Sequence, residues 1–144
     1  MKKIMLLMMT VIAIAFFTNA SAELVVITNA NNGINKLSKA DIVNLYMGKN
    51  RKFPNGLTAL PVDLRNTDTE KAQFYSSLTG KELPEINSYR ARLHFSGLGS
   101  PPVQAESMDE VLNIVGENKG AIGYIDRKKL DKRVKLIYIL NPSP

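Results

Sequence analysis

The 144-residue sequence contains no cysteine and a single histidine, and these two shortages exclude several kinds of chemistry. Without cysteine the chain forms no disulfide, no zinc–thiolate site, no thiol nucleophile and no lipid-modified N-terminal cysteine. The lone His94 lies between two apolar residues, which favours a structural role over catalysis. The chain also lacks a G-x-S-x-G elbow, an H-E-x-x-H pair and any dinucleotide or Walker motif. We therefore expect no enzyme, no cofactor and no bound metal.

Residues 1–22 have the three-part pattern of a secretory signal peptide. A basic start at Lys2 and Lys3 precedes an apolar run that extends to Phe17, and the segment ends in an Ala-Ser-Ala cleavage site. The run is too short and wrongly flanked for a membrane anchor. We predict export to the periplasm, cleavage after residue 22 and a single mature domain of residues 23–144, which is 122 of the 144 residues.

Positive charge is concentrated in one short segment. Without the two leader lysines, the 19 basic residues fall to 17 against 13 acidic ones, a net charge of +4. Residues 126–135 hold six of these basic residues and two acidic ones, and no aromatic side chain is interleaved with them. Nucleic-acid binding is therefore not expected. The segment is either a solvated face or a contact surface for an anionic partner.

Apolar patterning predicts an α/β domain. Continuous apolar runs typical of strands buried on both faces occur at residues 24–28, about 60–64, 120–125 and 134–139. Helical spacing predicts four helices, over residues 38–48, 67–80, 86–93 and 107–115. Ser38 and Ser107 each precede an acidic residue by three positions, which indicates a capping box. This order of elements predicts a mostly parallel sheet flanked by helices.

The turn between the second strand and the second helix is the strongest candidate for a binding site. In a parallel sheet, helix N-termini meet at one edge, where free backbone N–H groups bind oxyanions. Arg65 can form a bidentate fork on such an anion, and Thr67 and Thr69 can donate hydroxyl hydrogen bonds beside the helix start. Ser38, at another helix N-terminus, is a weaker candidate. The alternative is that Thr67 or Thr69 only caps the helix and that Arg65 is a surface side chain.

Four stretches of the sequence resemble the phosphate-binding group of periplasmic substrate-binding proteins of ABC transporters. Residues 37–49 (LSKADIVNLYMGK) are similar to the family's L-S/T-x-x-x-L-x-x-I-F-x-G-K helix, and Phe53–Gly56 stands where members carry Trp and then Gly. Residues 60–65, which lead to Phe74, are similar to the strand before the family's Arg-containing phosphate loop. Residues 119–125 (KGAIGYI) are similar to its G-A-I-G-Y strand.

This resemblance spans nearly all of residues 24–140. It implies one lobe of a type II periplasmic-binding-protein-like fold, and inorganic phosphate or another small oxyanion as the ligand. It places that ligand at the turn that holds Arg65, Thr67 and Thr69. It also implies an ABC transporter permease as a partner.

Two departures from that family bear on binding. Its loop has the pattern R-x-D-x-S-G-T, whereas residues 65–70 are RNTDTE, so the glycine is lost and Glu70 places a negative charge where phosphate would sit. Family members also close two lobes on the ligand, and this sequence covers one lobe. We therefore expect weak oxyanion binding, or a homodimer whose second copy replaces the missing lobe.

A second hypothesis is that the lobe has lost its ligand and acts as a protein-interaction module in the envelope. The Gly/Pro-rich loop 96–102 (SGLGSPP) and the basic segment 127–135 would then be contact surfaces for an envelope protein. The alternatives for these segments are a plain connection and a solvated charged face.

Overall fold

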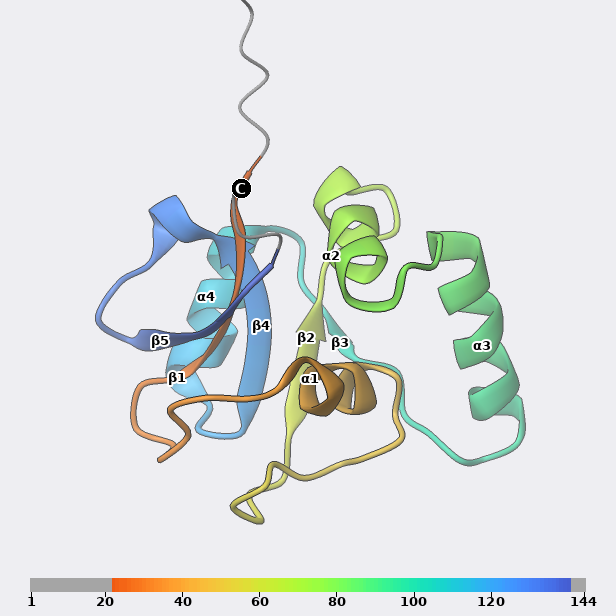
Figure 1. Cartoon of the computed structure of the whole chain (residues 1–144), viewed down its shortest axis with the longest axis horizontal. Helices are drawn as coiled ribbons and strands as arrows, with labels where there is room; N and C mark the ends of the chain where they lie inside the picture. The colour runs from red at the N-terminus through yellow and green to blue at the C-terminus, as the bar shows by residue number, and fades with distance from the viewer. Residues whose placement is uncertain (1–21, 141–144) are drawn as a thin grey trace, which may run out of the picture.

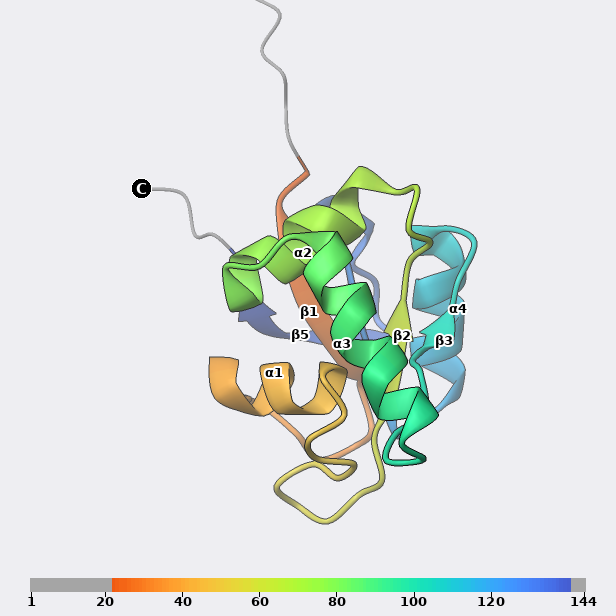
Figure 2. The same ribbon diagram turned by 90° about the vertical axis from the view of Figure 1, so that its right-hand side faces the viewer.

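The computed structural model describes residues 22–140, which form a five-stranded sheet with helices on both faces (Figures 1 and 2). The predicted signal peptide lies outside the described residues, apart from Ala22. The elements in chain order are β1 (Leu24–Asn29), α1 (Lys39–Tyr46), β2 (Leu60–Asp63), α2 (Thr69–Thr79), α3 (Leu83–Phe95), β3 (Val103–Gln104), α4 (Met108–Glu117), β4 (Ala121–Asp126), the 3-10 helix η1 (Arg127–Lys129) and β5 (Val134–Ile139). In this described part, every helix is too short or too polar to cross a membrane.

The strand order in the sheet is β3-β2-β4-β1-β5. β2 pairs in parallel with β3 and β4, whereas β1 pairs antiparallel with β4 and β5. Four strands of the described sheet therefore point the same way and only β1 opposes them, so the predicted mostly parallel α/β sheet is confirmed. β1 is buried along its whole length, as its continuous apolar run predicts, but such a run carries no information on strand direction.

Two neighbouring residues of β4 show how the helices divide between the faces of the sheet. Gly123 lies under α4, where a Cβ atom would come within 2.5 Å of a Val111 methyl carbon, so glycine permits the close approach of this helix. Tyr124 points to the opposite face, because side chains alternate along a strand. Its ring stacks on Phe74 of α2 with centroids 3.8 Å apart, and Tyr46 of α1 packs edge-on against Phe74. α4 therefore covers one face and α1 and α2 cover the other, with α3 outside α2 (Figure 2).

The helix ends largely follow the sequence signals. Ser38 forms the predicted capping box at the start of α1, and Gly80 ends α2 in the left-handed conformation with φ of 69°. Ser107 caps α4, but the Glu110 carboxylate accepts the N–H of Glu106 rather than that of Ser107, so the second capping box is only half formed. β3 was not predicted, because two residues are too few to show a periodic pattern.

Candidate functional site

The turn between β2 and α2, together with the first residue of α2, Thr69, holds three of the four residues predicted to bind an oxyanion. Arg65, Thr67 and Thr69 are all exposed there. The Asp68 N–H donates to the Arg65 carbonyl at 3.0 Å, and the Asp68 carboxylate accepts the Arg65 N–H at 3.2 Å. These two hydrogen bonds close the turn and hold the three residues at the carboxyl end of β2, beside the start of α2.

The first turn of α2 differs from the first turns of α1 and α4. Ser38 and Ser107 each cap their helix, because their hydroxyls accept the N–H groups of Asp41 and Glu110 at 3.1 Å. Asp68, which precedes α2, makes no side-chain capping hydrogen bond. The N–H groups at the positive end of the α2 dipole are therefore left uncapped by the preceding side chain. Ser38 lies at the start of α1 and not in the β2–α2 turn.

Carboxylates surround Arg65. Its guanidinium lies 3.3 Å from the Glu106 carboxylate and 3.6 Å from that of Asp68, and 48% of the side chain is exposed. The Thr69 hydroxyl donates to the Glu70 carboxylate at 3.4 Å. An open hollow of about 280 Å³ lies beside the turn. Its charged lining residues are four acids, Asp68, Glu70, Glu106 and Asp109, and one base, Lys129. Even so, within residues 22–140 no group of three His, Asp or Glu side chains is arranged to hold a metal ion.

Behind the exposed turn, Asp63 at the end of β2 is the centre of a buried cluster. Only 1% of its side chain is exposed. One carboxylate oxygen accepts from the Tyr124 hydroxyl at 2.5 Å and from the Leu64 N–H at 2.9 Å. The other accepts from the Tyr75 hydroxyl at 2.6 Å and from Arg90 Nη1 at 3.0 Å. These donors replace the water that the carboxylate loses on burial, which would otherwise be very costly.

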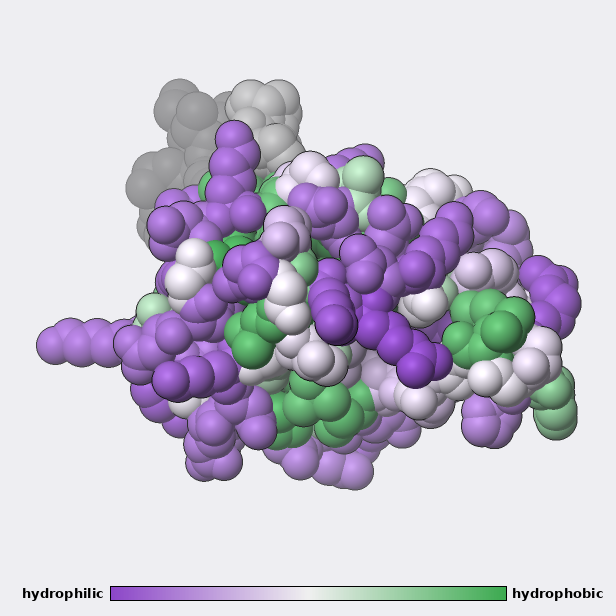
Figure 3. All heavy atoms as spheres, turned by 90° about the horizontal axis from the view of Figure 1, so that it is seen from below, coloured by the Kyte–Doolittle hydropathy of each residue, from purple (hydrophilic) through white to green (hydrophobic). Residues whose placement is uncertain are grey.

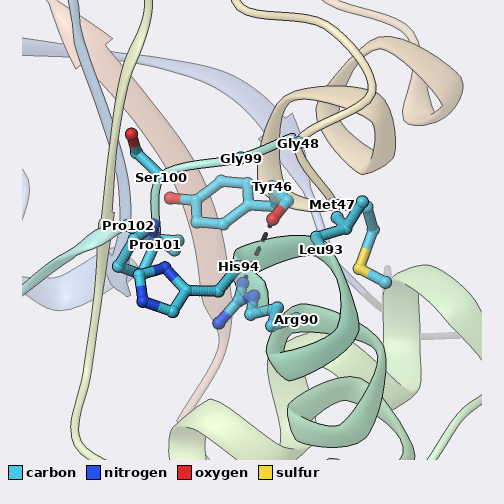
Figure 4. A pocket seen from close by; sticks show the side chains of 10 residues that line it. All are labelled: Tyr46, Met47, Gly48, Arg90, Leu93, His94, Gly99, Ser100, Pro101 and Pro102. Atoms are coloured by element: carbon cyan, nitrogen blue, oxygen red, sulfur yellow. Dashed lines mark hydrogen bonds between the residues drawn. The ribbon is translucent and has the colours of Figure 1, made fainter. Parts of the chain in front are cut away.

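Lys71 and Arg90 bring two positive charges to this carboxylate. Lys71 Nζ lies 3.6 Å from Asp63 and donates to the side-chain oxygen of Asn66 at 2.8 Å, and only 3% of the Lys71 side chain is exposed. Arg90 reaches across from α3, and its Nη2 donates to the Tyr46 carbonyl at 3.2 Å (Figure 4). Arg90 Nε is buried and has no hydrogen-bond partner within the described residues.

Burial keeps the tyrosines of this cluster neutral. It raises the pKa of Tyr46, Tyr75 and Tyr124 well above the ordinary value, and the negative charge of Asp63 raises each pKa further. The hydroxyls therefore stay protonated: those of Tyr75 and Tyr124 donate to the Asp63 carboxylate, and that of Tyr46 donates to the backbone carbonyls of Val62 and Ile122. Burial also lowers the pKa of Lys71, against the opposing attraction of Asp63.

A hollow of about 420 Å³ opens beside the buried cluster, among α2, α3 and the segment that leads into β3. We name it the Lys71–Arg90 hollow. It is lined by three charged residues, three amides and two prolines, namely Asp63, Lys71, Arg90, Asn66, Asn87, Gln104, Pro101 and Pro102. Arg90 and both prolines also line a neighbouring narrower pocket, where they lie near Tyr46 and His94 (Figure 4).

The charges of the buried cluster were not predicted, although the sequence holds one signal of them. Lys71 precedes Phe74 by three residues and Tyr75 by four, which places it on the apolar stripe of α2. A lysine in such a position predicts a buried charge with an acidic partner. Nothing in the spacing identifies Asp63 as that partner, or Arg90 as the second cation, because α3 meets β2 only in the folded chain.

The sheet, with a helix N-terminus at the carboxyl end of β2, has the fold of one lobe of solved phosphate-type periplasmic substrate-binding proteins. An ABC-type phosphate transport receptor from Vibrio cholerae is similar, with a TM-score of 0.65, 20% sequence identity and coverage of 81% of this chain and 45% of its own. PstS from Borrelia burgdorferi is similar with a TM-score of 0.63 and 12% identity, over 85% of this chain and 49% of its own. The predicted fold is therefore confirmed.

A third similar structure, described as a phosphate ABC transporter substrate-binding protein from Clostridium perfringens, contains bound phosphate. It has a TM-score of 0.65 and 19% identity, over 81% of this chain and 44% of its own. No protein-family model and no curated protein matches the sequence. The chain spans less than half the length of each of these three proteins. At 12–20% identity, the similarity establishes the fold alone.

Proposed function

We propose that this chain is a periplasmic, non-catalytic solute-binding-like protein that binds phosphate or another small oxyanion and is linked to ABC-type phosphate uptake. The observation that carries the proposal is the uncapped N-terminus of α2 beside Arg65. Asp68 gives this helix no side-chain cap, whereas Ser38 and Ser107 cap α1 and α4. Free N–H groups at a helix start are a ready anion site, and an exposed arginine beside them adds a charged fork.

Each of the predicted residues has a defined part in this proposal. The Arg65 guanidinium pairs with one edge of the oxyanion, and the exposed hydroxyls of Thr67 and Thr69 donate to it beside the helix start. Ser38 contributes least, since its hydroxyl already accepts the Asp41 N–H at another helix. An anion at the turn has to displace the Glu106 carboxylate, which lies 3.3 Å from Arg65.

The acidic setting of the turn predicts weak binding by a single copy. Glu70 and Glu106 repel an approaching anion, and the described lobe covers the ligand from one side only. A second copy, or another protein that supplies the opposite wall, would exclude water and strengthen the same contacts. An ABC permease is the partner that the proposed uptake role requires.

Isothermal titration of the mature chain, residues 23–144, with phosphate, sulfate and acetate tests the proposal. We expect millimolar phosphate binding that Arg65→Ala abolishes and that Glu70→Gly and Glu106→Gln strengthen. Arg127→Ala is the matched control, because Arg127 is similarly exposed and also pairs with a glutamate, Glu23. Absence of heat with every anion, together with unchanged behaviour of Arg65→Ala, would overturn the proposal.

Mass spectrometry of the periplasmic fraction tests export, with Glu23 as the expected N-terminal residue.

A second function is favoured by one observation, the exposed apolar side chains at the end of α3. Phe95, the last residue of α3, is 89% exposed, and Leu98, within the predicted contact loop 96–102, is 66% exposed. Seen from below in Figure 3, apolar side chains form several separate patches on the surface. These residues support the alternative role as an envelope interaction module. Cross-linking in intact cells tests this role. We expect the wild type to be cross-linked to an envelope protein and Phe95→Ser to lose that partner. The absence of any cross-linked partner with the wild type would contradict it.

A further inference from the structure

The charged residues that line the Lys71–Arg90 hollow have a net charge of +1. The ionised groups among its lining residues are Lys71 and Arg90, which are positive, and Asp63, which is negative. The Asp63 carboxylate carries one negative charge, so it offsets only one of these two cations, and both of its oxygens already accept from buried donors. A single charge of this kind next to a low-dielectric interior attracts a monoanion more strongly than it would in water.

Both cations also have donor capacity left over. The Lys71 ammonium carries three N–H groups and has two oxygen partners, on Asn66 and Asp63. Arg90 Nε is buried without a partner among the described residues, although Nη1 and Nη2 of the same guanidinium are bonded. Buried donors are rarely left unpaired, so the missing partner requires an explanation.

The size and lining of the hollow indicate the kind of anion. At about 420 Å³ it is within the range of small-molecule sites and far larger than an inorganic oxyanion. Its polar wall consists of Lys71, Arg90 and amide side chains such as that of Asn87, whereas Pro101 and Pro102 provide an apolar wall. A molecule with one carboxylate and a short apolar body matches both walls.

We infer that the Lys71–Arg90 hollow binds the carboxylate group of a small organic monoanion. The carboxylate lies toward Lys71 and Arg90, and the apolar body lies against Pro101 and Pro102. This site is separate from the oxyanion site proposed at the exposed turn, where the surrounding side chains are mostly acidic. Either site can therefore fail without the other.

Butyrate and benzoate are suitable probes, with butyramide as the uncharged control and inorganic phosphate as the comparison. We expect both carboxylates to shift backbone amide NMR signals of α2, α3 and residues 101–104, and butyramide to leave them unchanged. Asn87→Asp adds a negative charge to the wall without touching the Asp63 hydrogen bonds, and should weaken butyrate binding about tenfold or more. Arg65→Ala should leave butyrate binding unchanged, because Arg65 does not line this hollow.

Ser88→Asp is the matched control, since it makes the same charge change one residue along α3, on an exposed residue that lines a different pocket. If Asn87→Asp does not fold, Gln104→Glu on the exposed strand β3 places the charge at the other side of the hollow. The inference is overturned if neither carboxylate shifts these signals at 50-fold excess over about 1 mM protein. It is also overturned if Ser88→Asp weakens binding equally, or if phosphate occupies the hollow in preference to butyrate.

Discussion

The exposed β2–α2 turn and the buried Asp63 cluster are formed by neighbouring residues, yet they use charge in opposite ways. Arg65 in the turn pairs with carboxylates in contact with water, and 48% of its side chain is exposed. Asp63 is only 1% exposed and holds α2, α3 and β4 together through Lys71, Arg90 and Tyr124. Water screens the first set of charges and not the second. We therefore expect the charges of the buried cluster to contribute more to stability than those of the turn, where Arg65 is free to exchange its carboxylate partners.

The largest expected effect is that of Asp63→Asn. This change removes the carboxylate charge that the buried Lys71 and the half-buried Arg90 share. Breaking a buried ion pair in this way costs about 3–5 kcal/mol, and we expect the free energy of unfolding in urea to fall by that amount.

The matched control for Asp63→Asn is Asp109→Asn, which breaks an ion pair with Lys129 at 2.8 Å on the surface. Its carboxylate is 75% exposed, so the urea midpoint should hardly move. A similar loss of stability in both variants would show that the cluster and the surface do not differ as proposed.

Alkaline pH should weaken the cluster without any mutation. The pKa values of Tyr46, Tyr75 and Tyr124 are raised on folding, so above pH about 10 the unfolded chain releases protons that the folded chain keeps. Stability then falls as the pH rises, by up to about 1.4 kcal/mol per tyrosine and pH unit. Lys71 acts in the opposite sense, because its pKa is lowered on folding, but three tyrosines outweigh one lysine.

Absorbance at 295 nm together with urea unfolding between pH 8 and pH 11.5 measures this effect. We expect the three buried tyrosines to ionise only when the chain unfolds. Ionisation of all five tyrosines of the sequence in a chain that stays folded would contradict the burial argument.

The elements of the fold were predictable because their signals are local. The apolar run at residues 24–28, the cap at Ser38 and the helix end at Gly80 each involve a few consecutive residues. The buried cluster was not predictable, since Asp63 and Arg90 are 27 positions apart and meet only when α3 packs against α2. The direction of β1 was hidden for the same reason, because pairing is decided by topology and not by the composition of the strand.

A smaller effect is expected when one donor of the cluster is removed by Tyr124→Phe. The carboxylate of Asp63 then loses a 2.5 Å hydrogen bond, and the Leu64 N–H loses its 3.2 Å contact with the hydroxyl. A hydrogen bond to a charged group contributes about 1.5–3 kcal/mol, and we expect a loss within that range in thermal unfolding. Tyr138→Phe is the control, as Tyr138 lies half-buried on the edge strand β5, away from the Asp63 cluster. Equal losses in both variants would mean that the loss does not come from the hydrogen bonds of the Tyr124 hydroxyl with Asp63 and Leu64.

The smallest effect on stability is expected for Arg65→Ala, and it separates the two regions most directly. Arg65 pairs with the half-buried Asp68 at 3.6 Å and with the exposed Glu106 at 3.3 Å, and ion pairs in contact with water contribute less than about 1 kcal/mol. The urea midpoint should therefore stay close to that of the wild type, even though the same variant is expected to lose phosphate binding. A large loss of stability would place Arg65 among the structural charges, and the turn would then no longer be free to exchange its carboxylate partners for an anion.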